Sequence, residues 1–351
     1  MAHCGARHRR RGHRAKRSSA RLRRSWNCWR GRIRAIVILL GLSALGGCAS
    51  DSIVLTAAPA VTDGSVIAFP SAGSLQRSAD GRRFTPGGSA SLSGELLFPE
   101  GSGPFPAVVL AHGCNGNRNV GPAWGPVLRE WGYATFVIDS FRGRGITEVC
   151  TNGRILLPVQ RVPDAYGALR LLAAHRKIDS RRIALMGFSH GGALTMLAST
   201  AWAKETYAAA GQPSFRAFFP FYPNCNAAFP ERSRVSAPVR IHTGEADDWT
   251  PSRPCAELAA SLQASGEDVA INVYPGAHHA FDQARGKIFL PNVGNGADCF
   301  ARLPSILGPF PAEAGRGPPA CFKRGATVAG NPAAAAEARR NLRAQLDELM
   351  K

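Results

Sequence analysis

The chain has 351 residues, 45% of them hydrophobic, which is enough to bury one substantial core. Its length fits one large α/β domain with an N-terminal leader better than two domains. The formal net charge of +19 would favour a nucleic-acid partner if it covered a folded surface, but residues 1–34 hold 13 of the 43 basic residues and no acidic residue. The remainder has 30 basic and 24 acidic residues, a net charge of +6, so we expect no nucleic-acid partner.

Residues 1–47 have the pattern of a secretory signal peptide. The apolar stretch after the basic run is about 13 residues long, which is short for a transmembrane helix and typical of the h-region of a signal. The run Leu45-Gly46-Gly47-Cys48 resembles a bacterial lipobox, so we expect Cys48 to be lipidated and to hold the mature chain on the membrane. Ala49 is typical of lipoproteins sorted to the outer membrane, where this chain would face the periplasm. Ordinary cleavage nearby, which would give a secreted or periplasmic protein, is the alternative.

The cysteine content agrees with export. Cys4 and Cys28 belong to the leader. Outside the leader and the expected anchor at Cys48, six cysteines remain: Cys114, Cys150, Cys225, Cys255, Cys299 and Cys321. An even number in an exported chain predicts disulfides, although six cysteines allow 15 pairings. We expect the pairs Cys225–Cys255 and Cys299–Cys321, with Cys114–Cys150 as the third. No C-x-x-C or H-E-x-x-H pattern indicates a metal site.

The predicted elements alternate along the chain. Residues 48–84, rich in Ala, Ser, Gly and Thr, predict a tether that leads into an irregular or strand-like entry, and residues 85–351 predict one folded domain. Apolar runs predict strands at Ser91–Phe98, Ala107–Ala111, Ala134–Ile138, Ile183–Gly187, Phe215–Phe219, Val239–His242 and Ala270–Tyr274. Helices are predicted at Pro122–Trp131, Val162–His175, Gly191–Ala203, Pro254–Ala264 and Pro332–Met350. This alternation predicts an α/β fold with a mostly parallel central sheet and helices on both faces. Residues 282–331 predict an excursion pinned by a disulfide before the last helix.

The most informative motif is Gly187-Phe188-Ser189-His190-Gly191, which lies between a predicted strand and a predicted helix. This is the G-x-S-x-G nucleophile elbow in its expected context. The glycines allow close packing around the turn, which holds the serine in a strained backbone conformation at the N-terminus of the helix. We therefore interpret Ser189 as a candidate nucleophile.

A serine hydroxyl needs a base within hydrogen-bond reach, and that base needs a carboxylate to orient it. The order expected in an α/β hydrolase is Ser, then Asp or Glu, then His. The segment 243–251, which follows one predicted strand, contains Glu245, Asp247 and Asp248. The segment 274–281, which follows the next strand, contains His278 and His279. The sequence therefore supplies both partners in the expected order.

Three motifs together resemble the dienelactone hydrolase family of α/β hydrolases: Gly-Phe-Ser-His-Gly-Gly, Gly-Glu-x-Asp-x-x-x-Pro and Tyr-Pro-Gly-Ala-x-His-x-Phe. The resemblance spans residues 92–351. The resemblance implies the α/β-hydrolase fold, with Ser189 as nucleophile, Asp247 as orienting acid and His279 as base. The family's spacing thus prefers Asp247 over Asp248, and His279 over His278. The namesake enzymes carry cysteine in the elbow, so the serine here points to the esterase-like branches of the family.

An oxyanion hole is expected upstream of the elbow. The strand Ala107–Ala111 runs into the turn His112–Gly116, where the oxyanion-hole loop of this fold belongs. The backbone N–H groups of Cys114 and His190 are then expected to bind the oxygen of the tetrahedral intermediate. His112 itself is expected to pack under the loop.

Substrate contacts are harder to predict. Phe221 and Tyr222 follow a predicted strand and are candidates for lining the acyl pocket, although a buried strand continuing into a loop is the alternative. Arg142, or Arg144, is a candidate for binding a substrate carboxylate, with a surface charge as the alternative.

These features predict an exported serine hydrolase that cleaves a small-molecule carboxylic ester or lactone through an acyl-enzyme, without a cofactor. Peptidase-like acyl hydrolysis is the nearest alternative chemistry. A second alternative is a non-catalytic binding protein of the envelope with this fold.

Overall fold

The computed structural model describes residues 64–116, 120–208, 210–211, 213–310 and 319–350. The expected signal peptide and the expected lipidation site Cys48 lie outside the described residues. Among the residues described, no helix is both long enough and apolar enough to cross a membrane.

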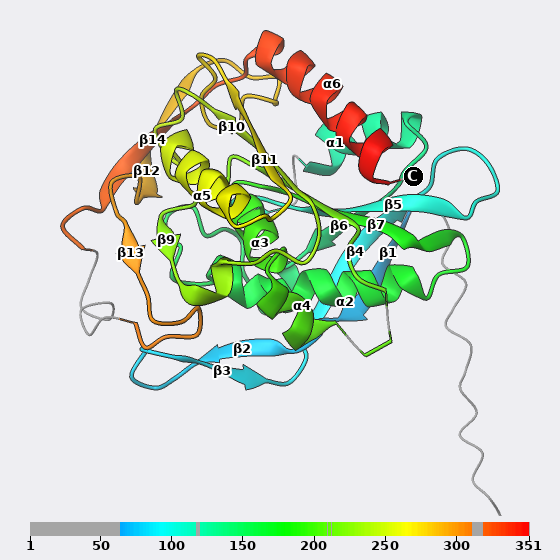
Figure 1. Cartoon of the computed structure of the whole chain (residues 1–351), viewed down its shortest axis with the longest axis horizontal. Helices are drawn as coiled ribbons and strands as arrows, with labels where there is room; N and C mark the ends of the chain where they lie inside the picture. The colour runs from blue at the N-terminus through cyan, green and yellow to red at the C-terminus, as the bar shows by residue number, and fades with distance from the viewer. Residues whose placement is uncertain (1–63, 117–119, 209, 212, 311–318, 351) are drawn as a thin grey trace, which may run out of the picture. The chain divides into compact units, whose positions relative to one another are not determined.

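A central sheet of eight strands organises the described chain (Figure 1). In order across the sheet the strands are β1 (Ser65–Pro70), β4 (Ser91–Leu97), β6 (Ala134–Asp139), β5 (Phe105–Ala111), β7 (Ile178–Phe188), β8 (Ala217–Phe221), β10 (Val239–Gly244) and β11 (Val269–Tyr274). All neighbours from β6 to β11 are parallel, whereas β4 is antiparallel to both β1 and β6. The central strands β5, β6 and β8 are buried along nearly their whole length, because both faces of the sheet are covered.

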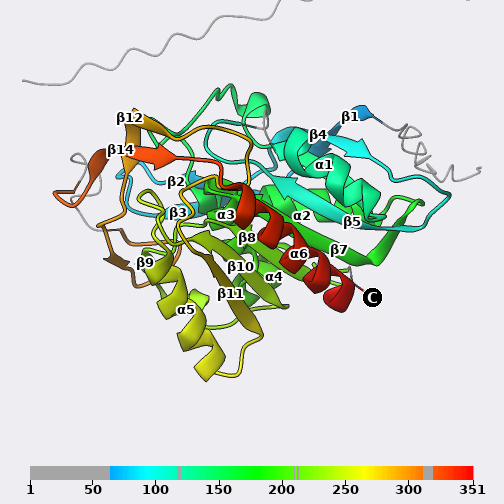
Figure 2. The same ribbon diagram turned by 90° about the horizontal axis from the view of Figure 1, so that it is seen from above.

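Helices cover the two faces of the sheet in separate groups. On one face α1 (Val120–Glu130) and α6 (Pro332–Leu349) share a buried cluster that includes Trp124 and Leu342. The two helices lie close together in both views of the ribbon (Figures 1 and 2), and Arg339 of α6 lies over the ring of Trp124. The other face buries residues of α2 (Val162–Ala173), α3 (His190–Ala198), α4 (Ala201–Tyr207) and α5 (Ser252–Ala264). The prediction of an α/β-hydrolase fold in a single domain is confirmed.

Each of the seven predicted strands is present in the sheet. The end of β8 differs from its predicted position. The sequence predicted a strand that ends at Phe219. In the structure β8 continues to Phe221, whose carbonyl oxygen accepts a hydrogen bond of 3.0 Å from the backbone N–H of Ser189. The extension therefore supports the elbow directly.

One prediction of local structure was wrong. The predicted helix at residues 191–203 is two helices, because Thr200 adopts an extended backbone and its side chain accepts a hydrogen bond from Ala203 N, which caps α4. The irregular or strand-like entry expected at the end of the tether forms β1, which pairs with β4 in the sheet, and β2 (Ser74–Arg77), which pairs with β3 (Phe84–Gly87). Only Phe69 of β1 is buried, so this strand adds little to the core.

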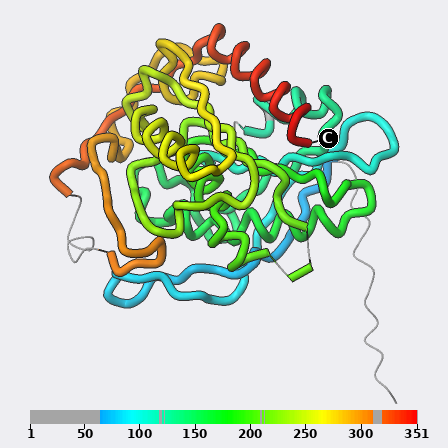
Figure 3. Tube along the Cα trace, in the orientation of Figure 1, coloured from blue at the N-terminus to red at the C-terminus, as the bar shows by residue number. Residues whose placement is uncertain are grey.

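The predicted excursion at residues 282–331 contains β12 (Ile288–Asn295), β13 (Ala301–Arg302) and β14 (Lys323–Val328). β12 pairs with β14 in an antiparallel manner, and β13 pairs with β9 (Ala227–Ala228). The chain after β13 runs alongside β3, as Figure 3 shows in orange and blue, with hydrogen bonds from Phe84 N to Leu307 O and from Phe310 N to Arg82 O. The excursion is therefore attached to the N-terminal hairpin as well as to the core.

All three expected disulfide pairs are bonded in the structure: Cys114–Cys150, Cys225–Cys255 and Cys299–Cys321. The first joins the loop after β5 to the loop after η1 (Arg142–Arg144). The third closes the segment between β12 and β14. Two of the three disulfides thus stabilise loops rather than the sheet.

Candidate active site

Ser189 lies at the turn between β7 and α3, with a backbone φ of +54°. Such a conformation is strained for a residue with a side chain, and it is held here by close backbone packing. A Cβ on Gly187 would lie 2.1 Å from Gly191 O, and a Cβ on Gly191 would lie 2.1 Å from Ala111 O. Both positions therefore require glycine, which explains the G-x-S-x-G pattern in physical terms.

A continuous chain of hydrogen bonds joins Ser189, His279 and Asp247. His279 Nε2 lies 2.9 Å from Ser189 Oγ, and His279 Nδ1 lies 2.8 Å from Asp247 Oδ2. His279 and Asp247 are both buried. The three residues follow β7, β10 and β11, which are parallel, so their carboxyl ends meet at the same edge of the sheet.

The carboxylate of Asp247 is fixed by its own loop. Its Oδ1 accepts hydrogen bonds from the backbone N–H groups of Trp249 and Thr250, at 2.9 and 2.8 Å. Thr250 Oγ1 lies 3.0 Å from Asp247 Oδ2, and also 3.0 Å from His279 Nδ1 and from the carbonyl oxygen of Tyr222. The sequence analysis did not single out Thr250, although a hydroxyl three residues after an Asp is a common partner for its carboxylate.

The other acidic and histidine residues of these two loops do not belong to the hydrogen-bonded chain at Ser189. Asp248 is exposed, and its Oδ1 accepts a hydrogen bond from Thr327 N of β14 at 2.8 Å. Glu245 accepts one from Gly276 N at 2.9 Å. His278 Nδ1 is buried and has no hydrogen-bond partner in the described part of the chain. None of these three side chains contacts Ser189.

Aromatic rings enclose His279 on two sides. The ring centroid of Tyr222 lies 4.7 Å from that of His279, and the centroid of Trp249 lies 4.8 Å away. Trp249 Nε1 donates a hydrogen bond of 2.8 Å to Gly294 O of β12. The excursion thus supports a ring that packs on His279.

The loop after β5 lies directly beside the serine. A Cβ on Gly113 would lie 3.6 Å from Ser189 Cβ, and Cys114 and His190 both line the cavity that contains Ser189. His112 packs beneath the loop: it is fully buried, and its Nδ1 lies 2.7 Å from Gly113 O. Burial holds the pKa of His112 well below its ordinary value.

A buried arginine, which the sequence analysis did not single out, supports this loop. Arg161 is fully buried at the end of η2 (Pro158–Arg161), and its Nη1 donates to His112 O at 3.0 Å and to His190 Nδ1 at 2.8 Å. Burial, with the charge of Arg161 second, lowers the pKa of His190 to about 3, so its ring is neutral and donates from Nε2 to Leu156 O. The ring of His190 is therefore engaged away from Ser189 by two partners.

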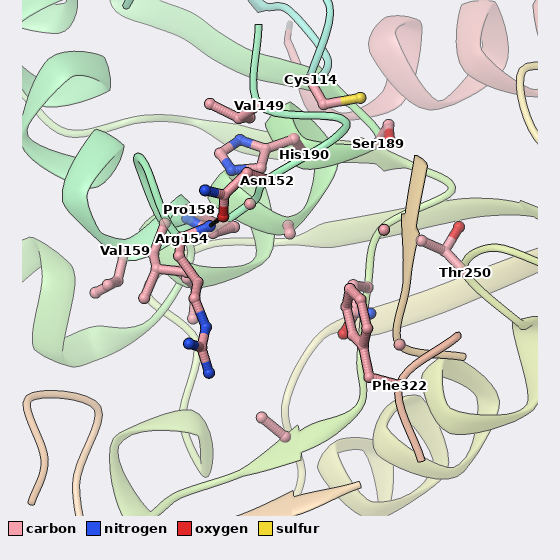
Figure 4. Close-up of a pocket in the computed structure, with 18 of the residues that line it drawn as sticks. Cys114, Val149, Asn152, Arg154, Pro158, Val159, Ser189, His190, Thr250 and Phe322 are labelled. Carbon is pink, nitrogen blue, oxygen red and sulfur yellow. Dashed lines mark hydrogen bonds between the residues drawn. The ribbon is translucent and has the colours of Figure 1, made fainter. Parts of the chain in front are cut away.

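A cavity of about 730 Å³ opens at Ser189 (Figure 4). Its aromatic lining consists of Phe84, Phe229, Trp249, Phe310 and Phe322. Aliphatic residues that line it include Val149, Val159, Leu197, Leu303 and Ile306. Its volume falls within the range that holds a drug-sized molecule, roughly 300–1,000 Å³. The residues described contain no cluster of three His, Cys, Asp or Glu side chains that could hold a metal ion.

The structure does not bring the candidate substrate contacts to this cavity. Phe221 and Tyr222 are buried in the cluster beneath the site, because β8 extends to Phe221 and the Tyr222 hydroxyl donates to Asp282 at 2.8 Å. Arg142 is exposed outside the cavity, with Nε 3.8 Å from Asp139. Arg144 is paired with buried Asp164 at 2.7 Å. Phe221, Tyr222 and Arg142, which were predicted as substrate contacts, are thus not among the described residues that line this cavity.

Comparison with known proteins gives consistent results. The model of the dienelactone hydrolase family matches residues 92–298. A probable 2-oxo-3-(5-oxofuran-2-ylidene)propanoate lactonase from a Bradyrhizobium species is 22% identical over 204 residues, covering 54% of this chain and 78% of the relative. A bis(hydroxyethyl) terephthalate hydrolase from Streptomyces coelicolor is 30% identical over 210 residues, covering 58% of this chain and 57% of the relative.

Among solved structures, a dienelactone hydrolase-like promiscuous phosphotriesterase from metagenomic libraries is similar with a TM-score of 0.51. It is 18% identical, and the match covers 82% of this chain and 100% of that chain, which is a likeness of fold. The family match spans more than half of the 351 residues and includes the elbow and the loops after β10 and β11. The protein thus belongs to the dienelactone hydrolase family of α/β hydrolases and is a carboxylic ester hydrolase.

Proposed function

We propose that the protein is an exported serine hydrolase that cleaves a carboxylic ester or lactone through an acyl-enzyme on Ser189. The observation that carries this proposal is the hydrogen-bonded chain from Ser189 Oγ through His279 to Asp247, with distances of 2.9 and 2.8 Å. Distances in this range permit the base to take the proton of the hydroxyl as the hydroxyl attacks.

In the first half of the reaction, His279 Nε2 takes the proton from Ser189 Oγ, which attacks the ester carbonyl carbon. The resulting oxyanion is bound by the backbone N–H groups of Cys114 and His190, which both line the cavity that contains Ser189. His279 then gives the proton to the leaving alcohol oxygen, and the acyl-enzyme remains. In the second half, His279 deprotonates a water that attacks the acyl carbon, and Ser189 leaves with the proton.

Asp247 accepts the Nδ1–H of His279 and so selects the tautomer in which Nε2 faces the serine. Thr250 lies against both groups and limits their movement. The positive charge that forms on His279 during the reaction faces a carboxylate that is itself held by two backbone N–H groups. These contacts support the role of Asp247 as the orienting acid.

We propose the type of bond that is cleaved, an acyl–oxygen bond, and not a particular substrate. The relatives' names include a lactonase and a terephthalate ester hydrolase, which both hydrolyse an acyl–oxygen bond. The serine nucleophile, in place of the namesake family's cysteine, favours ordinary esters.

A fluorophosphonate probe tests the nucleophile. We expect covalent labelling of the purified mature domain and loss of labelling in Ser189→Ala, together with loss of p-nitrophenyl ester hydrolysis. A folded wild-type protein that reacts with neither the probe nor the ester would contradict the proposal.

Export and anchoring are tested separately. The basic leader, the short apolar stretch and the lipobox-like end at Cys48 support cleavage before Cys48 and lipidation of its side chain. Mass spectrometry of the mature N-terminus should find a lipid-modified Cys48. An unmodified N-terminus at another residue would refute the anchor and leave the hydrolase proposal intact.

A further inference from the structure

We propose that Arg161 is a positioning residue for the reaction at Ser189, which holds the two backbone N–H groups of the oxyanion hole in place from beneath. The inference rests on the proposed hydrolase function, because an oxyanion forms only in that reaction. Figure 4 shows Cys114 and His190 with Ser189 at the wall of the cavity. Arg161 is not among the described residues that line this cavity, so it acts through the residues that it binds.

Arg161 joins the two segments that carry these N–H groups. Its Nη1 lies 3.0 Å from His112 O and 2.8 Å from His190 Nδ1. His112 lies directly after β5 and two residues before Cys114, whereas His190 supplies the second N–H group itself. A guanidinium Nη carries two hydrogens, so this nitrogen donates one hydrogen bond to each acceptor. The spacing between the two segments is therefore set at a single atom.

The ring of His190 accepts this hydrogen bond because it is neutral. Burial, with the charge of Arg161 second, lowers the pKa of His190 to about 3. Its Nε2 lies 2.9 Å from Leu156 O, and a carbonyl oxygen only accepts, so Nε2 carries the proton and Nδ1 accepts from Arg161. The ring thus has one hydrogen-bonding arrangement, which holds the residue at the start of α3 whose backbone N–H faces the oxyanion.

The ring of His112 fixes the direction of the other N–H group. Its Nε2 accepts a hydrogen bond from Ser140 N at 3.2 Å, so its Nδ1 carries the proton and donates to Gly113 O at 2.7 Å. Gly113 O and Cys114 N belong to one planar trans peptide unit, in which the carbonyl and the N–H point in opposite directions. Because the carbonyl is held by the buried ring, the N–H of Cys114 points away from that ring.

The guanidinium group of Arg161 is itself held in a closed site. Arg161 is fully buried between η2 and α2, and its Cζ lies 5.2 Å from the centre of the Phe141 ring. The same ring packs against His112, with 4.4 Å between the ring centroids. Burial lowers the pKa of Arg161 to about 10, so it stays charged at neutral pH.

This arrangement is not one that stability alone favours. Arg161 Nε and Nη2 are buried without a hydrogen-bond partner in the described part of the chain. No carboxylate lies within ion-pair distance of Arg161 in the described ranges, and the nearby carboxylate of Asp164 pairs with Arg144 instead. A buried cation that is only partly satisfied costs free energy of folding. Its two contacts from Nη1 to the oxyanion-hole segments are therefore the feature that a role in the reaction explains.

A matched pair of inhibitors separates positioning from a general loss of structure. An alkyl trifluoromethyl ketone adds to a serine nucleophile and forms a tetrahedral oxyanion, whereas the corresponding trifluoromethyl carbinol has nearly the same size and forms none. We expect Arg161→Met to raise the Ki of the ketone about 100-fold, as for the loss of one oxyanion donor, and that of the carbinol less than about threefold. On a p-nitrophenyl ester, kcat should fall by a similar factor with KM nearly unchanged.

Two further variants keep part of the arrangement. Arg161→Lys retains the charge and one donor group, and its kcat should exceed that of Arg161→Met by about tenfold. His190→Leu removes the Nδ1 acceptor but keeps the backbone N–H, and it should raise the Ki of the ketone about tenfold. The double variant Arg161→Met/His190→Leu should raise this Ki by less than the product of the two single effects, because both changes remove the same contact.

Arg240→Met is the matched control for the loss of a buried arginine. Arg240 is 8% exposed, lies near the start of β10 and pairs with Asp268. The loop of Asp247 follows the other end of that strand. We expect this variant to lower the thermal unfolding temperature and to leave the ratio of the two Ki values unchanged.

The outcomes can be told apart. An unchanged ratio of the two Ki values in a folded Arg161→Met protein would overturn the inference, as would a loss of kcat that only follows the loss of folded protein. If Arg161→Met does not fold, His190→Leu decides, and an unchanged Ki of the ketone in that variant contradicts the inference. Absence of fluorophosphonate labelling and of ester turnover in the wild type would overturn the proposed function itself.

Discussion

Two adjacent carboxylates after β10 have different surroundings, and this difference decides their roles. Asp247 is buried and accepts hydrogen bonds from two backbone N–H groups as well as from His279, whereas Asp248 is exposed and accepts one from Thr327 N. We expect Asp247→Asn to lower kcat by about 10³-fold or more, because the amide no longer selects the His279 tautomer. Asp248→Asn should change kcat less than about threefold, because it alters a surface contact. Steady-state kinetics on one p-nitrophenyl ester checks both, and the reverse ranking would contradict the assignment.

A third carboxylate, Asp282, is buried near the site without touching Ser189. Its two oxygens accept hydrogen bonds from Trp124 Nε1 at 2.7 Å and from the Tyr222 hydroxyl at 2.8 Å. Burial raises the pKa of Asp282, and the hydrogen bonds from Trp124 and Tyr222 oppose that rise. Trp124 Nε1 can only donate, so an amide at position 282 would have to give its oxygen to Trp124 and its NH₂ group to the Tyr222 hydroxyl, which would lose the acceptor of its own proton.

We therefore expect Asp282→Asn to lower the free energy of unfolding by about 1–3 kcal/mol. Glu257→Gln is the control, since the Glu257 side chain is 63% exposed and pairs with the exposed Arg253 on α5, where a change below about 1 kcal/mol is expected. Urea denaturation of both variants provides the measurement. Equal losses of stability in the two variants would contradict a stabilising role of the buried hydrogen bonds to Asp282.

At the scale of elements, the excursion between β11 and α6 forms part of the cavity without contributing any of the three hydrogen-bonded residues at the serine. Its disulfide Cys299–Cys321 closes the segment that carries Leu303, Ile306 and Phe310. We expect the double variant Cys299→Ser/Cys321→Ser to raise KM for bulky esters several-fold with a smaller change in kcat, because the cavity wall loosens while the elbow stays anchored in the sheet. The chain-entropy estimate for closing a segment of this length is about 3 kcal/mol, most of it local to the excursion.

Steady-state kinetics with a bulky and a small p-nitrophenyl ester separates the two effects. The small ester should show a KM close to that of the wild type, since it does not reach the excursion. A parallel fall in kcat for both esters, with KM unchanged, would mean that the disulfide supports the reacting groups instead of the wall.

The elements also show what the sequence could predict and what it could not. The parallel strands were predictable, because a strand buried on both faces is a continuous apolar run such as Ala134–Asp139. The residues that meet at the sheet edge were predictable from their position after strands and from the family motifs. The bounds of β1 could not be predicted, because only Phe69 of that strand is buried. The break at Thr200 was missed, because one side-chain cap interrupts a run that is otherwise typical of a helix. The cavity wall could not be predicted, since it depends on how residues 303–310 pack against Phe84 and Phe229.

At the scale of the folded domain, buried neutral histidines couple stability to pH. His242 on β10 is fully buried between the rings of Phe221 and Tyr274, with Nδ1 2.7 Å from the Tyr274 hydroxyl and Nε2 3.0 Å from Gln345 of α6. No acidic side chain pairs with it within the described ranges. Burial lowers its pKa from 6.5 to about 4, so the folded state holds the neutral ring. Burial likewise lowers the pKa of His190, so its ring is also neutral in the folded state.

Between the ordinary pKa of 6.5 and the folded-state pKa of about 4, the unfolded chain binds a proton at His242 that the folded chain does not bind. The free energy of unfolding therefore falls as the pH falls. The contribution of His242 is fully present above pH 6.5 and is lost progressively toward pH 4, with a slope of up to about 1.4 kcal/mol per pH unit. We expect His242→Gln, which cannot titrate, to be less stable than the wild type at pH 7.5 but to have a shallower loss of stability between pH 6.5 and 4.5. Urea unfolding at several pH values gives both slopes, and equal slopes would mean that His242 is not neutral in the folded protein.

Because the rings beside His242 belong to β8 and β11, whose loops hold Tyr222 and His279, the acid limit of the domain's stability should also limit the acid range of its activity.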